Sequence, residues 1–317
     1  MQNLISKPPK FIIILGTHFS GSGAVLDYLV GRGDLHNPLE KEEYLLPILP
    51  NGLMGLEAVT GKAFHSAICE YHLIKFQQIS EKLSHFYSSG PKKKELKKFS
   101  KIFLKNVYQL IQEISCADYP MRITWRELLK TPFEKNLSRV KNLIGLKQTM
   151  PKTRLLVSQK KFLEAVKKMH DNLFQVYANN KPTILNQAGS GWNPIESTKY
   201  FNNHKTILIT RDPRDQYLEI KHFKKGSSVI GFIDWYKEMQ SRLKLINDEN
   251  TLQIKFEDFV NNNKEYINII CDFLELSSSV KSSYNVELSK KNVYKFHRHK
   301  DREIQLIENH LKDYIKN

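Results

Sequence analysis

A segment rich in glycine and serine near the N-terminus combines residue types that bind anions. Gly16-Thr-His-Phe-Ser-Gly-Ser-Gly23 follows an unbroken apolar run at residues 11–15, and apolar residues recur at helical spacing in residues 24–30. This order predicts a buried parallel strand, a tight loop and a helix. In such a unit loop N–H groups point at the anion, and the helix N-terminus adds positive potential. The segment predicts a phosphate-binding loop, and a tight turn without a ligand is the alternative.

The loop differs from the P-loop of nucleotide triphosphatases at one position. Gly16 and Gly21 have the spacing of that motif, but Ser22 stands where its lysine belongs. That lysine holds the β- and γ-phosphates. The missing lysine argues against ATP or GTP hydrolysis.

A second anion-binding candidate follows another predicted strand. Lys205-Thr-Ile-Leu-Ile-Thr210 reads as a strand, and Arg211-Asp-Pro-Arg-Asp215 comes directly after it. Arginine binds phosphate oxygens through a planar, two-pronged set of donors. We therefore expect a phosphate contact at this turn, with structural salt bridges between Arg and Asp as the alternative.

Three acids follow the glycine-rich loop by a single helix. Glu40, Glu42 and Glu43 lie in Leu39-Glu-Lys-Glu-Glu-Tyr44, so they can return to the mouth of the same site. A carboxylate in that place is a candidate general base. A solvated charged loop is the alternative interpretation.

The composition limits the classes of partner and compartment. The 317 residues carry a net charge of +16, which favours an anionic partner such as a nucleotide, an acidic glycan, a lipid head group or a nucleic acid. No recognised nucleic-acid-binding motif accompanies this charge, so we expect no nucleic-acid partner. The three cysteines are far apart and form no metal or disulfide motif. We expect no metal, no transmembrane segment and a cytoplasmic protein, and no feature indicates an oligomeric state.

The predicted fold is a three-layer α/β domain that spans residues 1–317. Its central parallel sheet is expected to include strands at about residues 11–15, 183–186, 206–210 and 251–255. Residues of about 58–150 are predicted to form a mainly helical insertion, with helices at 66–88 and 94–114. This insertion is expected to form the wall of an acceptor site.

Several segments, in the correct order, resemble the sulfotransferases that use 3′-phosphoadenosine 5′-phosphosulfate (PAPS). The lysine-free loop and the Arg211 turn are the first two. Leu252-Gln-Ile-Lys-Phe-Glu-Asp-Phe-Val260 is similar to their strand and "(Y/F)EDL" segment, and Cys271-Asp-Phe-Leu-Glu-Leu276 to a helix ending in "FLGL". Leu288-Ser-Lys-Lys-Asn292 resembles a late basic loop that closes on the nucleotide. Glu43-Tyr44 and Asn51-Gly-Leu-Met-Gly-Leu56 resemble a stretch of bacterial members.

The resemblance implies a P-loop-like fold, an activity and a set of site residues. The 5′-phosphosulfate of PAPS would lie against Thr17, Ser20, Gly21, Ser22 and Gly23. The 3′-phosphate would lie against Arg211, with Lys290 and Lys291 as helpers. The sulfuryl group would pass to a hydroxyl or amine of a glycan or another small-molecule acceptor, which can itself be acidic. Glu43 is the first choice for the base, ahead of Glu40 and Glu42.

Two positions depart from the family pattern. The family usually has Lys or Arg just before the Ser-Gly pair, where this chain has Phe19, so His18 is a candidate substitute for that cation or for the base. The family often has Ser where this chain has Glu219, and Lys221 or Lys225 is the expected compensating donor. These departures leave open a catalytically inactive nucleotide-binding relative. The other alternative is a small-molecule kinase, which would share the strand, loop and helix at the start of the chain.

Overall fold

A parallel sheet of four strands forms the centre of the molecule. The computed structural model describes residues 9–61, 64–91, 94–120, 131–144, 152–175, 178–223, 228–299 and 301–315. The strand order is β4-β1-β5-β6, with β1 (Phe11–Gly16), β4 (Thr183–Asn186), β5 (His204–Thr210) and β6 (Thr251–Lys255). All three pairings in this sheet are parallel. The four predicted strands are confirmed to within two residues.

Alternate residues of β1 enter two different hydrophobic cores. Phe11, Ile13 and Leu15 pack into one core, whereas Ile12 and Ile14 pack into the other. Successive side chains of a strand point to opposite faces of its sheet, so a strand covered on both faces must be apolar throughout. The unbroken apolar run therefore reflects a three-layer fold, as predicted.

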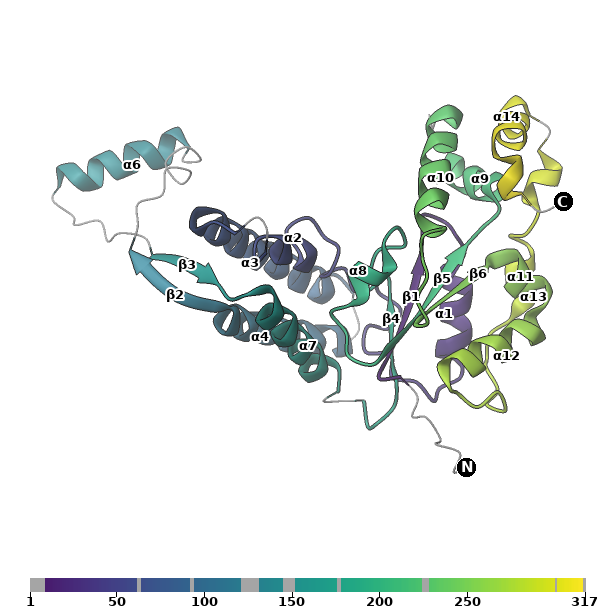
Figure 1. Ribbon diagram of the computed structural model, residues 1–317, viewed down its shortest axis with the longest axis horizontal. Coiled ribbons are helices and arrows are strands. Elements are labelled where there is room, and N and C mark those ends of the chain that lie inside the picture. The colour runs from purple at the N-terminus through teal and green to yellow at the C-terminus, as the bar shows by residue number, and fades with distance from the viewer. Residues whose placement is uncertain are drawn as a thin grey trace.

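Different helices cover the two faces (Figure 1). On the side of Ile12 lie α1 (Ser22–Gly31), α11 (Phe256–Asn261) and α12 (Asn263–Leu274). The core on the side of Phe11 contains residues of α2 (Leu53–Ala58), α3 (Ser66–Ser88), α4 (Lys94–Ile114), α7 (Gln159–Gln175), α9 (Pro213–Phe223), α10 (Val229–Leu243) and α14 (Arg302–Leu311). The predicted bounds of the two long helices α3 and α4 are confirmed.

The predicted helical region also contains a strand that the sequence analysis did not identify. β2 (Ser115–Pro120) directly follows α4 and pairs antiparallel with β3 (Lys152–Leu156). Beyond the end of this hairpin lies α6 (Pro132–Leu143), apart from the other helices (Figure 1). β2 forms through pairing with a strand distant in sequence, which a local periodicity cannot reveal.

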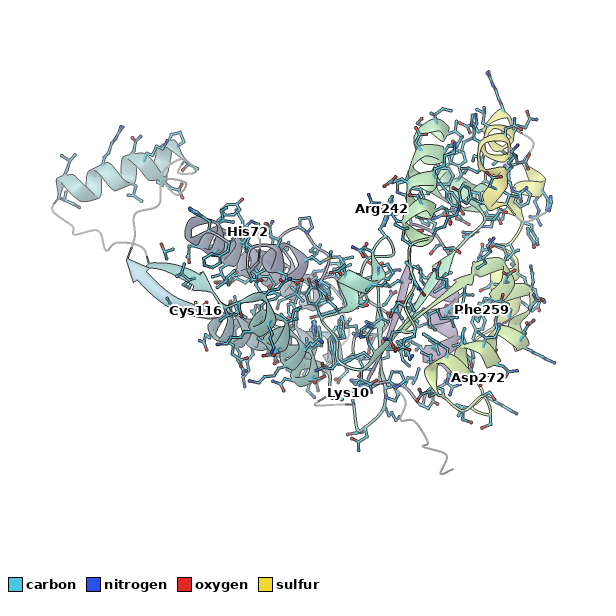
Figure 2. The ribbon with its side chains drawn as sticks, in the orientation of Figure 1. Lys10, His72, Cys116, Arg242, Phe259 and Asp272 are labelled. Atoms are coloured by element: carbon cyan, nitrogen blue, oxygen red, sulfur yellow. The ribbon has the colours of Figure 1, made fainter. Side chains whose placement is uncertain are left out.

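Short elements complete the edge of the sheet where the strands end. These are α8 (Pro194–Thr198), α13 (Val286–Lys290) and the 3₁₀ turns η1 (Lys295–Arg298) and η2 (Lys312–Tyr314). Figure 2 shows side chains filling the space between the sheet and its helices, with Phe259 on α11 among them. Because the carboxyl ends of parallel strands share one edge, the loops after β1, β4, β5 and β6 meet there.

Candidate functional site

The loop between β1 and α1 presents backbone donors in a conformation that depends on glycine. Gly21 has a φ of 85° at the N-cap of α1, and a Cβ atom on it would lie 2.4 Å from the Phe256 ring. Among the described residues, none accepts a hydrogen bond from the backbone N–H groups of residues 18–21. Such N–H groups beside a helix N-terminus can bind an anion.

Two side chains orient this loop by holding its carbonyl groups. Gln216 Nε2 donates to the carbonyl oxygens of Thr17 and His18, at 2.7 and 2.5 Å. Arg211 Nη1 donates to the carbonyl oxygen of Phe19 at 3.0 Å. In a planar trans peptide the carbonyl and the next N–H point in opposite directions. The N–H groups of residues 18, 19 and 20 therefore point away from these two side chains.

Two hydroxyl groups of the loop are buried without a partner. Thr17 Oγ1 and Ser20 Oγ have no hydrogen bond with any described residue. A buried polar atom without a partner costs about 1–3 kcal/mol, so native structures seldom leave one unsatisfied. An oxyanion lying on the loop would accept from both hydroxyls, and the donors present fit a phosphate or sulfate group.

Gln187 connects the loop to the neighbouring strand. Its side chain accepts from the N–H of Gly16 at 3.3 Å and donates to Ser22 Oγ at 3.2 Å. Gln187 comes directly after β4 and has a left-handed φ of 51°. The sequence analysis gave no role to Gln187 or Gln216, although both stand where a predicted strand and its turn end.

Arg211 lies between the glycine-rich loop and the late basic segment. Its side chain is buried, and Nη2 donates to the carbonyl oxygen of Asn292 at 2.6 Å. The guanidinium carbon lies 5.1 Å from the centre of the Phe256 ring. The buried Nε has no partner among the described residues. Arg211 therefore retains a donor for a ligand at the place where the sequence predicted a phosphate contact.

Arg214, the second arginine of the turn, has a different environment. It forms ion pairs with Asp212 at 2.8 Å and with Glu308 at 3.1 Å. Its guanidinium carbon lies 3.6 Å from the centre of the Phe296 ring. Arg214 is thus the structural salt bridge that the sequence offered as the alternative, and it connects the turn to α14.

Glu257, in the first turn of α11, supports the Arg211 turn. Its Oε1 accepts from the N–H of Asp212 at 3.0 Å. Burial raises the pKa of the Glu257 carboxyl to about 7, against the lowering effect of that N–H. This acid therefore connects α11 to the Arg211 turn and titrates near neutral pH.

A cavity of about 450 Å³ lies between the loop and Arg211. Its walls come from four segments distant in the sequence: Phe19, Ser20, Gly21, Ser22, Gly23, Ala24 and Asp27; Arg211 and Glu219; Phe256; and Ser289, Asn292 and Lys295. Lys290 and Lys291 are exposed and do not line it, and Lys290 pairs with Glu287 at 2.7 Å. The structure brings the late segment to the cavity, but through other residues than the two predicted lysines.

The acid at position 219 has a cation of its own. Lys295 Nζ lies 2.6 Å from Glu219 Oε1, and Arg211 Nη2 lies 3.6 Å from the same oxygen. Burial alone would raise the pKa of Glu219, but the hydrogen bond and charge of Lys295, with the charge of Arg211, lower it. Lys221 instead pairs with Glu303, and Lys225 lies outside the described residues.

A second cavity, of about 470 Å³, lies on the other side of the loop. Phe19, Ser20 and Ser22 line both cavities. The other lining residues are Gly16, Thr17, His18, Glu43, Leu45, Ile48, Gln187, Gly189, Ser190, Gly191 and Trp192. The loop therefore forms a wall shared by two spaces, each large enough for part of a ligand.

Glu43 lies in this second cavity on an anchored backbone. Its carbonyl oxygen accepts from Tyr87 Oη at 2.8 Å, and the N–H of Tyr44 donates to Asn186 at the end of β4. The Glu43 side chain is exposed, and its carboxylate pairs with none of the described residues. The carboxylate is thus available to a ligand.

The other two candidate acids are placed differently. Glu40 lines a separate cavity of about 140 Å³ with His36 and Lys98. Neither Glu40 nor Glu42 is among the residues that line the cavity containing Glu43. The structure therefore brings Glu43, and not its two neighbours, to the glycine-rich loop.

Aromatic side chains surround the two exposed residues of the loop. The ring of His18 lies 5.8 Å from that of Trp235, which contacts Trp192 edge-on at 5.5 Å. Phe19 has a φ of 54° and stacks on Phe223 at 5.0 Å. His18 faces the cavity of Glu43, so the structure places both candidate bases in one space.

Two classes of feature are not found in the described part of the chain. No cluster of three or more His, Cys, Asp or Glu side chains there has the arrangement to hold a metal ion. None of the helices in that part has the length and apolar character to cross a bilayer.

Comparisons with known proteins return solved sulfotransferase structures. No protein-family model and no curated protein matches the chain. The sulfotransferase domain of the Synechococcus PCC 7002 olefin synthase matches with a TM-score of 0.41 and 15% identity, over 98% of this chain and 90% of that one. The sulfotransferase domain of the curacin biosynthetic pathway matches with a TM-score of 0.40 and 13% identity, over 97% of this chain and 99% of that one. Sulfotransferase STF9 of Mycobacterium avium matches with a TM-score of 0.39 and 11% identity, over 98% of this chain and 77% of that one.

Proposed function

We propose that this chain is a sulfotransferase that moves a sulfuryl group from PAPS to a hydroxyl or amine of a glycan or another small-molecule acceptor. The observation that carries the proposal is the pair of cavities that share Phe19, Ser20 and Ser22. Group transfer needs a donor and an acceptor held on either side of the group that moves. The glycine-rich loop forms the wall that the two cavities share, and it offers N–H and hydroxyl donors that have no partner among the described residues.

Each cavity has the chemistry for one of the two substrates. The cavity of Arg211 and Lys295 would hold the nucleotide, with Arg211 against a phosphate. The cavity of Glu43 combines a carboxylate with the apolar surfaces of Leu45, Ile48 and Trp192. A sugar ring, which has polar edges and an apolar face, fits such a mixed surface.

In the proposed reaction Glu43 has a role in proton transfer and the glycine-rich loop has a role in charge stabilisation. PAPS, when bound, supplies the sulfuryl group, whose bond to the leaving phosphate breaks as the acceptor atom bonds to sulfur. Glu43 would accept the proton that the acceptor loses. The N–H groups of the loop would offset charge on the leaving phosphate, as preorganised donors do in phosphoryl transfer. None of these roles requires a metal ion.

A second candidate function rests on Phe19. This residue stands where a cation would stabilise the transferring group, and it stacks on Phe223 instead. A catalytically inactive relative that only binds the nucleotide fits this observation. A small-molecule kinase is disfavoured, because Ser22 replaces the lysine that such enzymes use.

A thermal-shift comparison of nucleotides separates these functions. Adenosine 3′,5′-bisphosphate should stabilise the protein, by roughly 2.7 kcal/mol at 100 times its dissociation constant, and ATP with magnesium much less. Release of the bisphosphate from PAPS in the presence of an acceptor panel then distinguishes an enzyme from an inactive relative. Equal or greater stabilisation by ATP with magnesium would favour the kinase.

A further inference from the structure

The helix α6 has an exposed apolar side. Phe133, Leu137, Val140 and Ile144 follow one another at intervals of four, three and four residues, which places them on one side of a helix. The side chain of Phe133 is 74% exposed and that of Ile144 is 65% exposed. Isolated exposed apolar residues are ordinary, but a continuous apolar side on one helix indicates a binding surface.

The opposite side of α6 is basic. Lys135 and Arg139 are exposed there, about 120–160° around the helix axis from Phe133 and Leu137. In the sequence, residues 121–152 contain eight Lys and Arg against two Glu. A helix with this division of apolar and basic residues has the composition of helices that lie in the surface of a membrane.

A hydrogen-bonded cap between neighbouring residues forms the N-terminus of α6. Thr131 Oγ1 accepts from the N–H of Glu134 at 3.2 Å, and a Glu134 carboxylate oxygen accepts from the N–H of Thr131 at 2.8 Å. This reciprocal pair is a capping box, and Pro132 has the preferred place at the first helical position. A helix of 12 residues is marginally stable in water, so burial of its apolar side would stabilise it.

The position of α6 makes its apolar side accessible. Figure 1 shows α6 beyond the end of the β2–β3 hairpin, on the far side of α3 and α4 from the central sheet. In Figure 2 the side chains drawn on α6 stand apart from those of the other elements. A flat partner could therefore reach α6 without contacting the candidate site.

We propose that α6 binds the surface of an anionic lipid bilayer, with its apolar side among the acyl chains and its basic side against the head groups. Charge complementarity favours this partner, because the whole chain carries +16 and α6 adds exposed cations on the side opposite its apolar side. The size of the surface argues against a second copy of the chain. A helix of 12 residues is about 18 Å long and 10 Å wide, a footprint of roughly 180 Å², whereas a stable dimer buries about 800 Å² on each partner.

Sedimentation of the full chain with vesicles tests the proposal. The protein should sediment with vesicles of phosphatidylcholine and phosphatidylglycerol, and much less with vesicles of phosphatidylcholine alone. Binding to the vesicles that contain phosphatidylglycerol should weaken as the salt concentration increases. Lys135→Glu/Arg139→Glu should lower partitioning on the order of 30-fold or more, since each lost cation weakens binding several-fold. Lys160→Glu/Lys161→Glu makes the same change of charge on exposed residues of α7 and should have little effect.

A second pair of variants separates the apolar contribution. Leu137→Glu/Val140→Glu should abolish vesicle binding, whereas Leu245→Glu, at an 80% exposed leucine elsewhere, should preserve it. Both should leave the melting temperature nearly unchanged, because the side chains are exposed. Failure of the unaltered chain to sediment with anionic vesicles, or equal binding by the α6 variants, would overturn the proposal. The proposal would also be overturned if the unaltered chain self-associates without binding vesicles and Leu137→Glu/Val140→Glu removes that self-association.

Discussion

The ammonium group of Lys295 lies 2.6 Å from a carboxylate oxygen of Glu219. Both residues line the cavity proposed for the nucleotide, together with Arg211. An acid at this position would repel a phosphate, and the neighbouring cation compensates for its charge. Because Lys295 neutralises the charge of Glu219, the acid is compatible with an anion-binding site in this cavity.

Removal of the Lys295 charge should weaken nucleotide binding through Glu219. We expect Lys295→Ala to lower affinity for adenosine 3′,5′-bisphosphate on the order of tenfold, because the acid is then uncompensated. Adding Glu219→Gln in the same chain should restore most of the loss. Titration calorimetry of the two single variants and the double variant measures this coupling, and a double variant as weak as Lys295→Ala would contradict the assignment.

The two arginines of the turn should behave differently. Arg211→Ala should weaken binding of the bisphosphate by about 1.5–3 kcal/mol, the usual value of a charge-assisted hydrogen bond. Arg214→Ala should mainly lower the melting temperature, since it breaks ion pairs with Asp212 and Glu308. Calorimetry and thermal unfolding of both variants separate the effects. Similar small losses of affinity in two well-folded variants would refute the role of Arg211.

Glu43 is the predicted base. Glu43→Gln should lower the transfer rate by about 10²–10⁴-fold, the usual size of a general-base effect, with nucleotide affinity nearly unchanged. Glu40→Gln is the matched control, because Glu40 lines a different cavity, and it should retain activity. Steady-state rates with PAPS and an identified acceptor check both variants. If Glu43→Gln is active and His18→Ala is not, the histidine has the role instead.

Two glycines of the loop form a matched pair for stability. Gly21→Ala should lower the free energy of unfolding by more than about 2 kcal/mol, because alanine disfavours a φ of 85° and its Cβ would collide with Phe256. Gly23→Ala, in α1 with no atom near its Cβ position, should raise stability by about 0.5–1 kcal/mol. Urea unfolding of both variants measures the contrast, and equal effects would show that the loop adopts another conformation.

Glu257 should make stability depend on pH. Its pKa is about 7 in the folded chain and near the ordinary 4.5 when unfolded, so the folded state binds more protons between these values. Stability from this group is therefore complete below pH 4.5 and falls as the pH rises to about 7. The unfolding free energy of Glu257→Gln, relative to the unaltered chain, should rise by about 3 kcal/mol over this range. Buried His170 is present in both proteins, so its opposite contribution cancels. A constant difference would show that Glu257 does not titrate there.

The central strands and the two candidate anion-binding turns could be recognised from the sequence alone. The apolar run of β1, the glycine-rich loop and the strand before Arg211 are recognisable because local propensity and periodicity act within a few residues. The same applies to α3 and α4, whose bounds the apolar spacing defined. These features require no knowledge of distant contacts.

Which side chains meet at the loop depends on the packing of elements that are far apart in the sequence. Gln216 contacts Thr17 across 199 positions of the chain, and Lys295 contacts Glu219 across 76. Only the family resemblance ranked Glu43 ahead of Glu40 and Glu42 in the sequence. In the structure, backbone contacts of Glu43 with α3 and β4 bring it, unlike the other two acids, to the cavity beside the glycine-rich loop. Such convergence depends on how separate elements pack, and a one-dimensional pattern contains no measure of that packing.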